Sequence, residues 1–303
     1  MNILIIGVSK SPLFLRYKEE ALKRGHYIES LLPSQLIFSY SNEGVAFFTR
    51  GLKKPLEKFD LVYVQASSPK RRPDVLLFLK YIHQKYGIKV VYKKYVDPNY
   101  TLLTTPGIDY YDQFKNKLPF PKSHIFFNVI SAKELSSKID YPSILKVNAL
   151  GLGKQGRGVF KVNTPDEFID TVTDYKDIAN RFILREFIPN DGDIRVFIVG
   201  YKAVGAMKRT PKNGDFRSNI SQGGYGELYD LKSNPLIKNL AEKAAKLRRA
   251  EIAGVDIMIH AITKKPYILE INHGPQFIGI ETLAGINVAK EVIKYFEQVV
   301  QKT

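Results

Sequence analysis

The 303-residue sequence contains no cysteine. This absence excludes disulfides, cysteine-ligated zinc, iron–sulfur clusters and catalysis by a thiol. Folding needs no oxidising compartment, and no basic leader with an apolar core is visible at the start, so we expect a cytoplasmic protein. No uncharged apolar stretch approaches the roughly 18 residues of a membrane-spanning helix, and we expect no membrane partner.

Several catalytic motifs are missing as well. The five histidines form no HExxH pair, and there is no GxSxG motif, which leaves zinc-peptidase and serine-hydrolase functions without support. A Walker loop is absent, and no GxGxxG follows the first predicted strand. We find no internal repeat and no low-complexity segment.

What is present is typical of a globular protein, with 44% hydrophobic and 25% charged residues. The length suits two or three domains. The 46 Lys and Arg residues outnumber the 30 Asp and Glu residues, for a formal net charge of +16. This excess is compatible with nucleotide phosphates, nucleic acids or acidic peptides as partners, and does not choose among them.

The first 95 residues alternate short apolar runs with helix patterns, which predicts an α/β unit with a parallel sheet. Clear examples are the predicted strands Ile3–Ile6 and Leu61–Val64, and the helix Pro73–Tyr86, which begins at a proline and precedes Gly87. The segment Val45–Phe48 alternates only weakly. Prolines and a glycine between residues 93 and 123 interrupt regular structure and indicate a linker with one short helix.

A second α/β rhythm follows the linker, and from Arg181 the chain is rich in strands. The pair Gly200-Tyr201 separates two strands as a tight hairpin. Thr164 is suited to cap a helix, and a last helix runs from Asn287 to about Gln301. We therefore predict an α/β protein that is α+β in its C-terminal part, with domains at 1–95, 96–182 and 183–303.

A glycine-rich loop is the first candidate for chemistry. Lys146 lies on a short predicted strand, and the loop after it holds four glycines within a span of eight residues: Gly151, Gly153, Gly156 and Gly158. Such a loop lets backbone N–H groups approach a phosphate, and a nearby lysine adds charge. A mobile hairpin without a ligand would have the same composition, and the loop alone does not decide between the two.

The second candidate is a set of oxygen ligands. Glu270 and Asn272 are two residues apart at the end of a predicted strand and therefore share a face. Asp256 lies inside an apolar strand, where a carboxylate is costly unless it is paired or metal-bound. If these strands are neighbours, the three side chains converge and suit Mg²⁺. The alternative is a hydrogen-bonded strand end with salt bridges.

Two polar loops are the third and fourth candidate sites. Lys208 and Arg209 precede a glycine-rich segment in which Arg217 could stabilise charge on a transferred phosphoryl group. A solvated charged loop is the alternative. The turn from Arg185 to Asp193 exposes backbone groups that could read an adenine edge. Among the histidines, we single out only His273, beside Asn272, as a possible substrate contact.

In this order, the four sites resemble the ATP-grasp superfamily, and specifically the RimK-type α-L-glutamate ligases. The resemblance is strongest over Ile183–Ile286, and over residues 1–95 it is only at the level of an α/β pattern. The segments that carry it are Asp193-Ile194-Arg195, Asp215-Phe216-Arg217-Ser218-Asn219, Ala253-Gly254-Val255-Asp256-Ile257, Glu270-Ile271-Asn272, Gly279-Ile280-Glu281 and Gly285-Ile286-Asn287.

The resemblance implies an ATP-grasp fold, with a Rossmann-like N-terminal domain and a nucleotide held between two α+β subdomains. It assigns ATP to Lys146, the Gly151–Gly158 loop, Glu186, Phe187, Asp193, Arg217, Ser218 and Asn219. Asp256, Glu270 and Asn272 would bind two Mg²⁺ ions, with Mn²⁺ a possible substitute. Arg217 and Asn219 would be catalytic, and Arg195, Lys208, Arg209 and His273 are more speculative substrate contacts.

This chain departs from the family in two places. The family usually follows Glu-x-Asn with Ala-Ser-Pro-Gly, whereas this chain has His273-Gly274-Pro275-Gln276. The family also has a lysine before the helix of its central domain. Here no lysine lies between Asp97 and Asp112, so Lys93, Lys94 or Lys115 would have to replace it.

The implied activity is ATP-dependent ligation of a carboxylate to an amine through an acyl phosphate, for example adding glutamate to a peptide, protein tail or small acid. The alternatives are a ligase for a biosynthetic or natural-product intermediate, a basic nucleic-acid-binding protein, and a nucleotide binder without catalysis. No nucleic-acid-binding motif is apparent, so nucleic acid is not expected as a partner. A homo-oligomer is compatible with the family.

The charge is concentrated near the start of the chain. Residues 1–96 hold 17 Lys and Arg against 7 Asp and Glu, an excess of +10. The cluster Lys70-Arg71-Arg72 follows the predicted strand Leu61–Val64, where ligands of parallel sheets tend to bind. We hypothesise that this part presents a basic surface to an acidic acceptor, although a solvated basic face would have the same composition.

Overall fold

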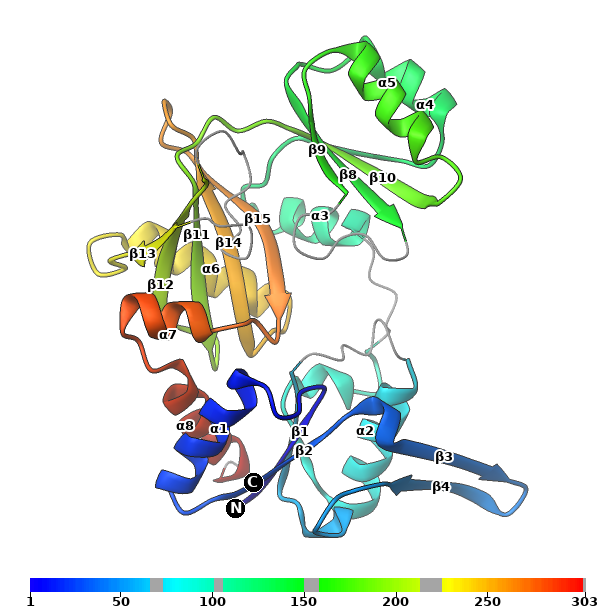
Figure 1. The fold of residues 1–303 in the computed structure, drawn as a ribbon, viewed down its shortest axis with the longest axis vertical. Helices are drawn as coiled ribbons and strands as arrows, with labels where there is room; N and C mark the ends of the chain where they lie inside the picture. The colour runs from blue at the N-terminus through cyan, green and yellow to red at the C-terminus, as the bar shows by residue number, and fades with distance from the viewer. Residues whose placement is uncertain (66–72, 101–105, 150–157, 213–224, 302–303) are drawn as a thin grey trace.

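The computed structural model describes residues 1–65, 73–100, 106–149, 158–212 and 225–301. In these ranges the strands form three larger sheets, two of four strands and one of five, and one two-stranded sheet. The sheets follow one another along the long axis of the molecule, with the N-terminal unit at one end (Figure 1). The α/β expectation is confirmed.

The N-terminal sheet is parallel, with the strand order β2-β1-β5-β6. Its central strand β1 is an apolar run, and Ile3–Ile6 are fully buried in it. Helix α1 begins at Pro12 because the Ser11 side chain accepts the backbone N–H of Phe14. The elements are β1 (Asn2–Ile6), α1 (Pro12–Lys23), β2 (Tyr27–Leu31), η1 (Pro33–Gln35), η2 (Leu56–Lys58), β5 (Leu61–Val64), α2 (Pro73–Tyr86), β6 (Lys89–Val90) and η3 (Lys93–Tyr95).

A two-stranded hairpin, β3 (Leu36–Ser41) and β4 (Gly44–Thr49), projects from this unit (Figure 1). Its base is held by aromatic packing, because Phe47 contacts the rings of Phe78 and Tyr81 on α2. The weak alternation at Val45–Phe48 corresponds to β4, whereas the strand β3 was not predicted from the sequence.

The second four-stranded sheet is antiparallel, with the order β7-β10-β8-β9. Two helices cover one of its faces, and Phe168 and Phe182 are fully buried between them and the sheet (Figure 1). Thr164 caps the second helix as predicted, by accepting the N–H of Glu167. The elements are α3 (Pro106–Lys115), β7 (Ser123–Phe126), α4 (Val129–Ser136), β8 (Ser143–Ala149), β9 (Val159–Val162), α5 (Pro165–Asp174) and β10 (Ala179–Glu186).

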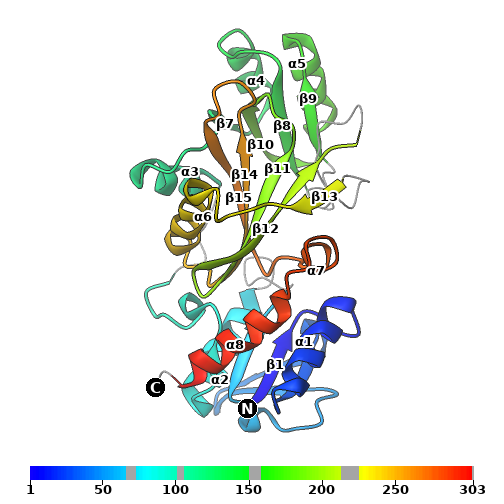
Figure 2. The ribbon, with the colours of Figure 1, turned by 90° about the vertical axis from the view of Figure 1, so that its left-hand side faces the viewer.

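The five-stranded sheet is antiparallel, with the order β13-β12-β11-β14-β15. Helix α6 packs on one face, over a core that includes Ile194, Val196 and Val255 (Figure 2). The predicted hairpin at Gly200-Tyr201 joins β11 to β12, and both residues have positive φ. The elements are β11 (Asp193–Val199), β12 (Lys202–Thr210), β13 (Tyr225–Leu228), α6 (Pro235–Leu247), β14 (Ile252–Ile259) and β15 (Pro266–His273).

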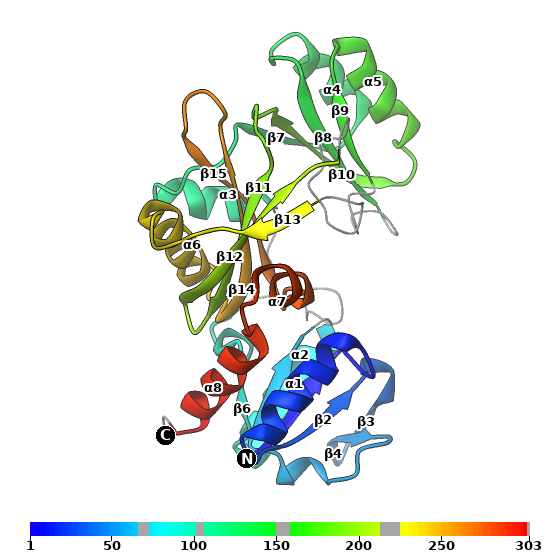
Figure 3. The same cartoon turned by 60° about the vertical axis from the view of Figure 1, so that its left-hand side comes forward.

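The last two helices, α7 (Ile278–Ala284) and α8 (Val288–Gln301), lead the chain back to its beginning. Helix α8 lies beside α1 (Figures 2 and 3). Its fully buried Phe296 packs 5.4 Å from the ring of Tyr63 on β5. The N-terminal core therefore includes residues from the end of the sequence. No helix in the described ranges is long and apolar enough to cross a membrane.

Candidate functional site

Two neighbouring strands bring the predicted metal ligands together. Asp256 on β14 is paired directly with Glu270 on β15, and Asn272 follows on the same face. The Asn272 amide nitrogen lies 2.7 Å from a Glu270 carboxylate oxygen and 3.4 Å from one of Asp256. Glu270 is exposed and Asp256 is buried. The sequence predicted that these three side chains would converge if their two strands were neighbours. The strands do pair, and the side chains lie together.

Two arginines neutralise the buried carboxylate. Arg195 donates two hydrogen bonds to Asp256, at 2.7 and 2.6 Å, and Arg209 lies 3.2 Å from the same group. Burial alone would raise the pKa of Asp256, but the charges and hydrogen bonds of Arg195 and Arg209 outweigh it and lower this pKa to about 2. Asp256 is thus an anion at any physiological pH.

Arg209 links Asp256 to a second buried acid. Its Nε donates to the Asp193 carboxylate at 2.8 Å, and its Nη2 pairs with the other oxygen of that carboxylate. Burial raises the pKa of Asp193, and the charge of Arg209 opposes this effect. Asp193, which the resemblance assigns to ATP, is therefore engaged by a neighbouring arginine in this structure.

Lys146 faces this cluster from the other sheet. It lies on β8 opposite Ile183 of β10, on the face that α4 and α5 leave uncovered. The charge of Arg185, which shares this face, and burial lower the pKa of Lys146 to about 8, whereas Glu270 and Asp256 act in the opposite direction. The lysine therefore lies within the electrostatic field of the acid cluster, across the space between the two sheets.

The donor set fits a hard divalent cation. Two carboxylates and one side-chain amide converge, and Mg²⁺ prefers oxygen ligands of this kind, together with phosphate oxygens and water. Asp256, Glu270 and Asn272 are the side chains that would bind it. In the described ranges, no group of three or more His, Cys, Asp or Glu residues is arranged to hold a metal ion, and the candidate site combines two such residues, Asp256 and Glu270, with the Asn272 amide.

Three of the other residues predicted to bind ATP lie at the ends of β10 and of the glycine-rich loop. Glu186 ends β10, and its backbone N–H donates to the carbonyl of Lys122 at 3.0 Å. Phe187 follows, with the Lys161 ammonium 4.3 Å from its ring centroid. The Gly158 carbonyl accepts the N–H of Val147 at the end of the glycine-rich loop. Gly151, Gly153, Gly156, Arg217, Ser218 and Asn219 lie outside the described residues.

The speculative substrate residues do not share one location. Arg195 and Arg209 belong to the acid cluster, whereas Lys208 lies on the opposite face of β12 and pairs with Asp191 at 2.7 Å. His273 lies against Tyr92, with ring centroids 5.3 Å apart, and within 2.5 Å of the Lys94 ammonium. Lys70, Arg71 and Arg72 lie outside the described residues.

Lys94 is one of the three lysines that could replace the family's missing lysine. Lys94 is buried and donates to the carbonyl of Arg248 at 2.9 Å, in addition to its contact with His273. Lys115 lies over the ring of Tyr111 on α3. Of the three candidates, Lys94 is the one whose ammonium contacts the residue directly after Asn272.

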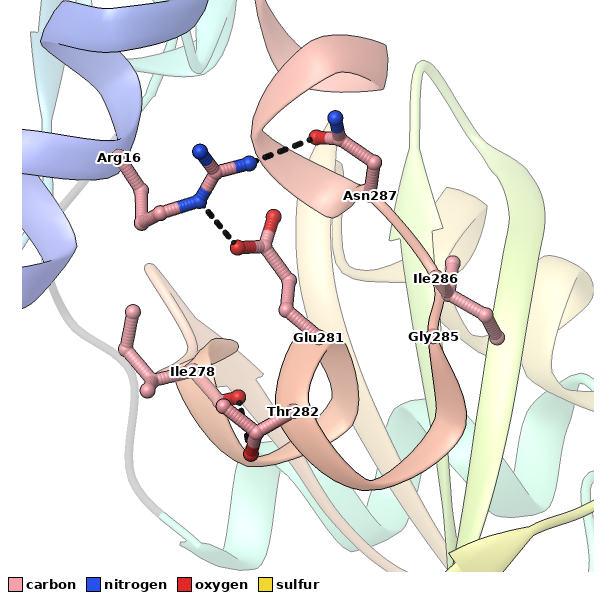
Figure 4. Close-up of a pocket in the computed structure, with 7 residues that line it drawn as sticks. All are labelled: Arg16, Ile278, Glu281, Thr282, Gly285, Ile286 and Asn287. Carbon is pink, nitrogen blue, oxygen red and sulfur yellow. Dashed lines mark hydrogen bonds and ion pairs between the residues drawn. The ribbon is translucent and has the colours of Figure 1, made fainter.

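A pocket of about 300 Å³ lies between α1 and α7, and none of the acid-cluster residues lines it (Figure 4). Arg16 crosses it, donating to Glu281 at 2.6 Å and to Asn287 at 3.2 Å. Ile278 and Ile286 form part of its apolar wall (Figure 4). Glu281 and Asn287, which the family motif includes, therefore serve the contact between the N-terminal unit and the rest of the chain.

Sequence reasoning missed Gln65, Tyr92 and the contacts of Lys94. Gln65 follows β5 directly, at the carboxyl end of a parallel strand, where side chains often meet ligands. That position was a usable signal, although the two carbonyls to which the Gln65 side chain donates, those of Gly274 and Pro275, lie more than 200 residues away in the sequence.

A lysine-bearing antiparallel sheet that faces an acid cluster on a second antiparallel sheet is the arrangement of the ATP-grasp fold. The chain belongs to the RimK-like ATP-grasp family, whose model matches residues 113–296, more than half of the sequence. The resemblance inferred from the motifs is confirmed, and so is the predicted fold class.

Two relatives carry similar names. A probable alpha-L-glutamate ligase from Cellvibrio japonicus is 33% identical over 181 residues, 59% of this chain and 58% of that protein. Probable alpha-L-glutamate ligase 1 from Shewanella oneidensis is 37% identical over 150 residues, 49% of this chain and 48% of that protein. The matched region thus spans roughly half of each curated relative.

Solved structures with the same fold cover nearly the whole chain. The ATP-grasp ligase PsnB, complexed with a phosphomimetic variant of its minimal precursor, Mg and ADP, matches with a TM-score of 0.70 at 16% identity, over 99% of this chain and 98% of PsnB. D-alanine–D-alanine ligase from Bacillus anthracis matches with a TM-score of 0.63 at 15% identity, over 99% and 98%.

Proposed function

We propose that this protein is an ATP- and Mg²⁺-dependent carboxylate–amine ligase that forms an amide bond and releases ADP. The observation that carries the proposal is the position of Lys146 opposite Asp256, Glu270 and Asn272, on two sheets of the ATP-grasp fold. A cation on one side and metal-binding oxygens on the other suit a polyphosphate between them.

The reaction needs no nucleophile from the protein. A substrate carboxylate oxygen attacks the γ-phosphorus of ATP, and ADP leaves with the electrons of the broken P–O bond. The amine nitrogen of the second substrate then attacks the acyl phosphate carbon, phosphate leaves, and the nitrogen loses a proton. When bound, Mg²⁺ neutralises phosphate charge. The chain positions both substrates and excludes water.

Within the proposal, each part of the site has a role. Lys146 and the Gly151–Gly158 loop bind the phosphates, and Glu186 and Phe187 contact adenine. Arg217 and Asn219 stabilise charge at the transferred phosphoryl group, as the family resemblance implies. Asp256, Glu270 and Asn272 bind two metal ions, and Mn²⁺ is expected to replace Mg²⁺.

The substrates proposed are an amino acid, glutamate first among them, and a peptide, a protein tail or a small acid. The names of the relatives support glutamate. The neighbouring structures determined with precursor peptides support a peptide partner and keep a natural-product peptide as the second candidate. The charge of the first 96 residues, including Lys70, Arg71 and Arg72, favours an acidic acceptor.

The test is a screen of amino acids and acidic peptides by ADP release, with mass spectrometry of the products. We expect ADP and phosphate only when Mg²⁺, a carboxylate and an amine are all present, and a product heavier than the acceptor by one or more amino-acid residues. ATP binding without turnover for any acceptor would indicate a nucleotide binder. Salt-sensitive binding of DNA or RNA that is indifferent to Lys146→Ala would favour the nucleic-acid alternative.

The position of Lys146 predicts a pH dependence of ATP binding. In the free protein its pKa is about 8, and ATP favours the charged form, so affinity is expected to fall as the pH rises through 8. The largest expected slope is about tenfold per pH unit. Isothermal titration from pH 7 to 9.5 at fixed free Mg²⁺ measures it.

Lys146→Arg is the matched control, because a guanidinium stays charged across this range. Its ATP affinity is expected to be nearly constant between pH 7 and 9.5. A wild-type affinity that does not change with pH would contradict the assigned contact.

A further inference from the structure

Gln65 occupies a fixed position between the N-terminal sheet and the strand that carries the predicted metal ligands. It directly follows β5 and is buried, with 2% of its surface exposed. Its backbone N–H donates to the carbonyl of Ile6 at 2.9 Å, which extends the parallel ladder between β5 and β1. The main chain at Gln65 is thus part of the rigid sheet.

The side chain of Gln65 reaches across to the turn after β15. Its Nε2 donates to the carbonyl of Gly274 at 2.8 Å and to that of Pro275 at 3.2 Å. Its Oε1 accepts the hydroxyl of Tyr17 at 2.8 Å. Both ends of the Gln65 amide are therefore engaged, and because backbone carbonyls only accept hydrogen bonds, the Nε2 end must face the turn.

The turn is held from its other side as well. The N–H of Gly274 donates to the Tyr92 hydroxyl at 2.7 Å, and this hydroxyl donates to the carbonyl of Ile252 on β14 at 2.7 Å. Gly274 has φ +58°, and a Cβ at this position would lie 1.8 Å from the carbonyl oxygen of Gln65. Only glycine allows the two main chains to approach so closely.

We propose that Gln65 is a positioning residue for the metal site, because it fixes the end of β15 two residues beyond Asn272. This inference rests on the proposed function. Metal-binding side chains need support from neighbouring groups to hold their geometry. The turn that Gln65 holds is also where this chain departs from the family pattern, at His273-Gly274-Pro275-Gln276.

The test uses Gln65→Met, which keeps a side chain of similar length and removes both donated hydrogen bonds. Mn²⁺ binding is measured in the presence of a saturating non-hydrolysable ATP analogue, through the electron paramagnetic resonance signal of free Mn²⁺. We expect affinity to fall about 10- to 100-fold, the usual effect of losing a group that supports metal ligands. Tyr17→Phe removes only the hydrogen bond to Oε1 and leaves the two donated bonds in place, so it is expected to give a smaller loss in the same direction.

Tyr295→Phe is the matched control. It removes a hydroxyl on α8 that lies 3.4 Å from the carboxylate of Glu251, the residue before β14, and it does not contact the turn at Gly274. It is expected to bind Mn²⁺ as the wild type does. If Gln65→Met does not fold, Tyr17→Phe alone decides the question against this control.

The outcomes are distinct. Wild-type Mn²⁺ affinity in both Gln65→Met and Tyr17→Phe would overturn the positioning role. Equal losses in these variants and in Tyr295→Phe would overturn it too, since they would reflect a loosened contact between the units. A wild-type protein that binds neither the nucleotide nor Mn²⁺ would refute the proposed function itself, and the inference with it.

Discussion

Replacing Glu270 by glutamine is expected to abolish turnover. Glu270 is the exposed member of the acid cluster, and its carboxylate lies directly across from Asp256 on the neighbouring strand. Glutamine preserves shape and removes the charge that a divalent cation requires. Losing several kcal/mol of charge stabilisation corresponds to a rate on the order of a thousandfold lower.

ADP release with the substrates found in the screen measures this effect. The unfolding temperature is expected to stay near that of the wild type, because Glu270 is exposed. Glu291→Gln, which removes an exposed carboxylate on α8 that pairs with Lys294, is the control and should leave the rate unchanged. A Glu270→Gln protein as active as the wild type would refute the metal assignment.

Asp256→Asn is expected to cause the largest loss of stability. The variant leaves Arg195 and Arg209 beside an uncharged amide in a buried environment. Removing one partner of a buried ion pair costs about 3–5 kcal/mol, because the remaining charge stays desolvated. Chemical denaturation at pH 7 measures the difference in the free energy of unfolding.

The pH dependence of the same variant gives a second readout. The pKa of Asp256 is about 2 in the folded protein, below its ordinary value of 3.8. The ionised carboxylate therefore stabilises the fold above pH 4, and this contribution is lost as the pH falls toward 2. The variant should lack that part of the acid sensitivity.

Asp191→Asn is the control for Asp256→Asn. Asp191 is exposed and pairs with Lys208 at 2.7 Å, so its loss should cost less than about 1 kcal/mol. Equal losses of stability in the two variants would contradict the role assigned to the buried cluster.

Local sequence signals predicted the elements well where the flanking residues were decisive. The bounds of β5 were predicted correctly at Leu61–Val64, and α2 was predicted from Pro73 to about Tyr86, because the helix starts at a proline and a glycine follows it. The short helix α7 and the strand β3 were missed. Helix α7 has no side-chain cap at its start, and β3 lacks a strong alternation of apolar and polar residues.

The acid cluster was predictable because a carboxylate inside an apolar strand needs a partner. Which residue would be that partner could not be predicted. Arg195 and Arg209 were interpreted as possible substrate contacts, whereas in the structure both bind Asp256. Strand register decides this, since Arg195 pairs with Asp256 across β11 and β14. No local sequence signal specifies which residue of β14 lies opposite Arg195, because the two strands are about 60 residues apart in the sequence.

The return of α8 to the N-terminal core has a consequence for the order of folding during synthesis. Val292, Ile293 and Phe296 are fully buried against elements made at the start of the chain. On the ribosome, the apolar surface of the N-terminal unit must wait for some 200 residues before it is covered. Both antiparallel sheets emerge and can fold first, so the N-terminal unit, although it is synthesised before them, completes its core after them.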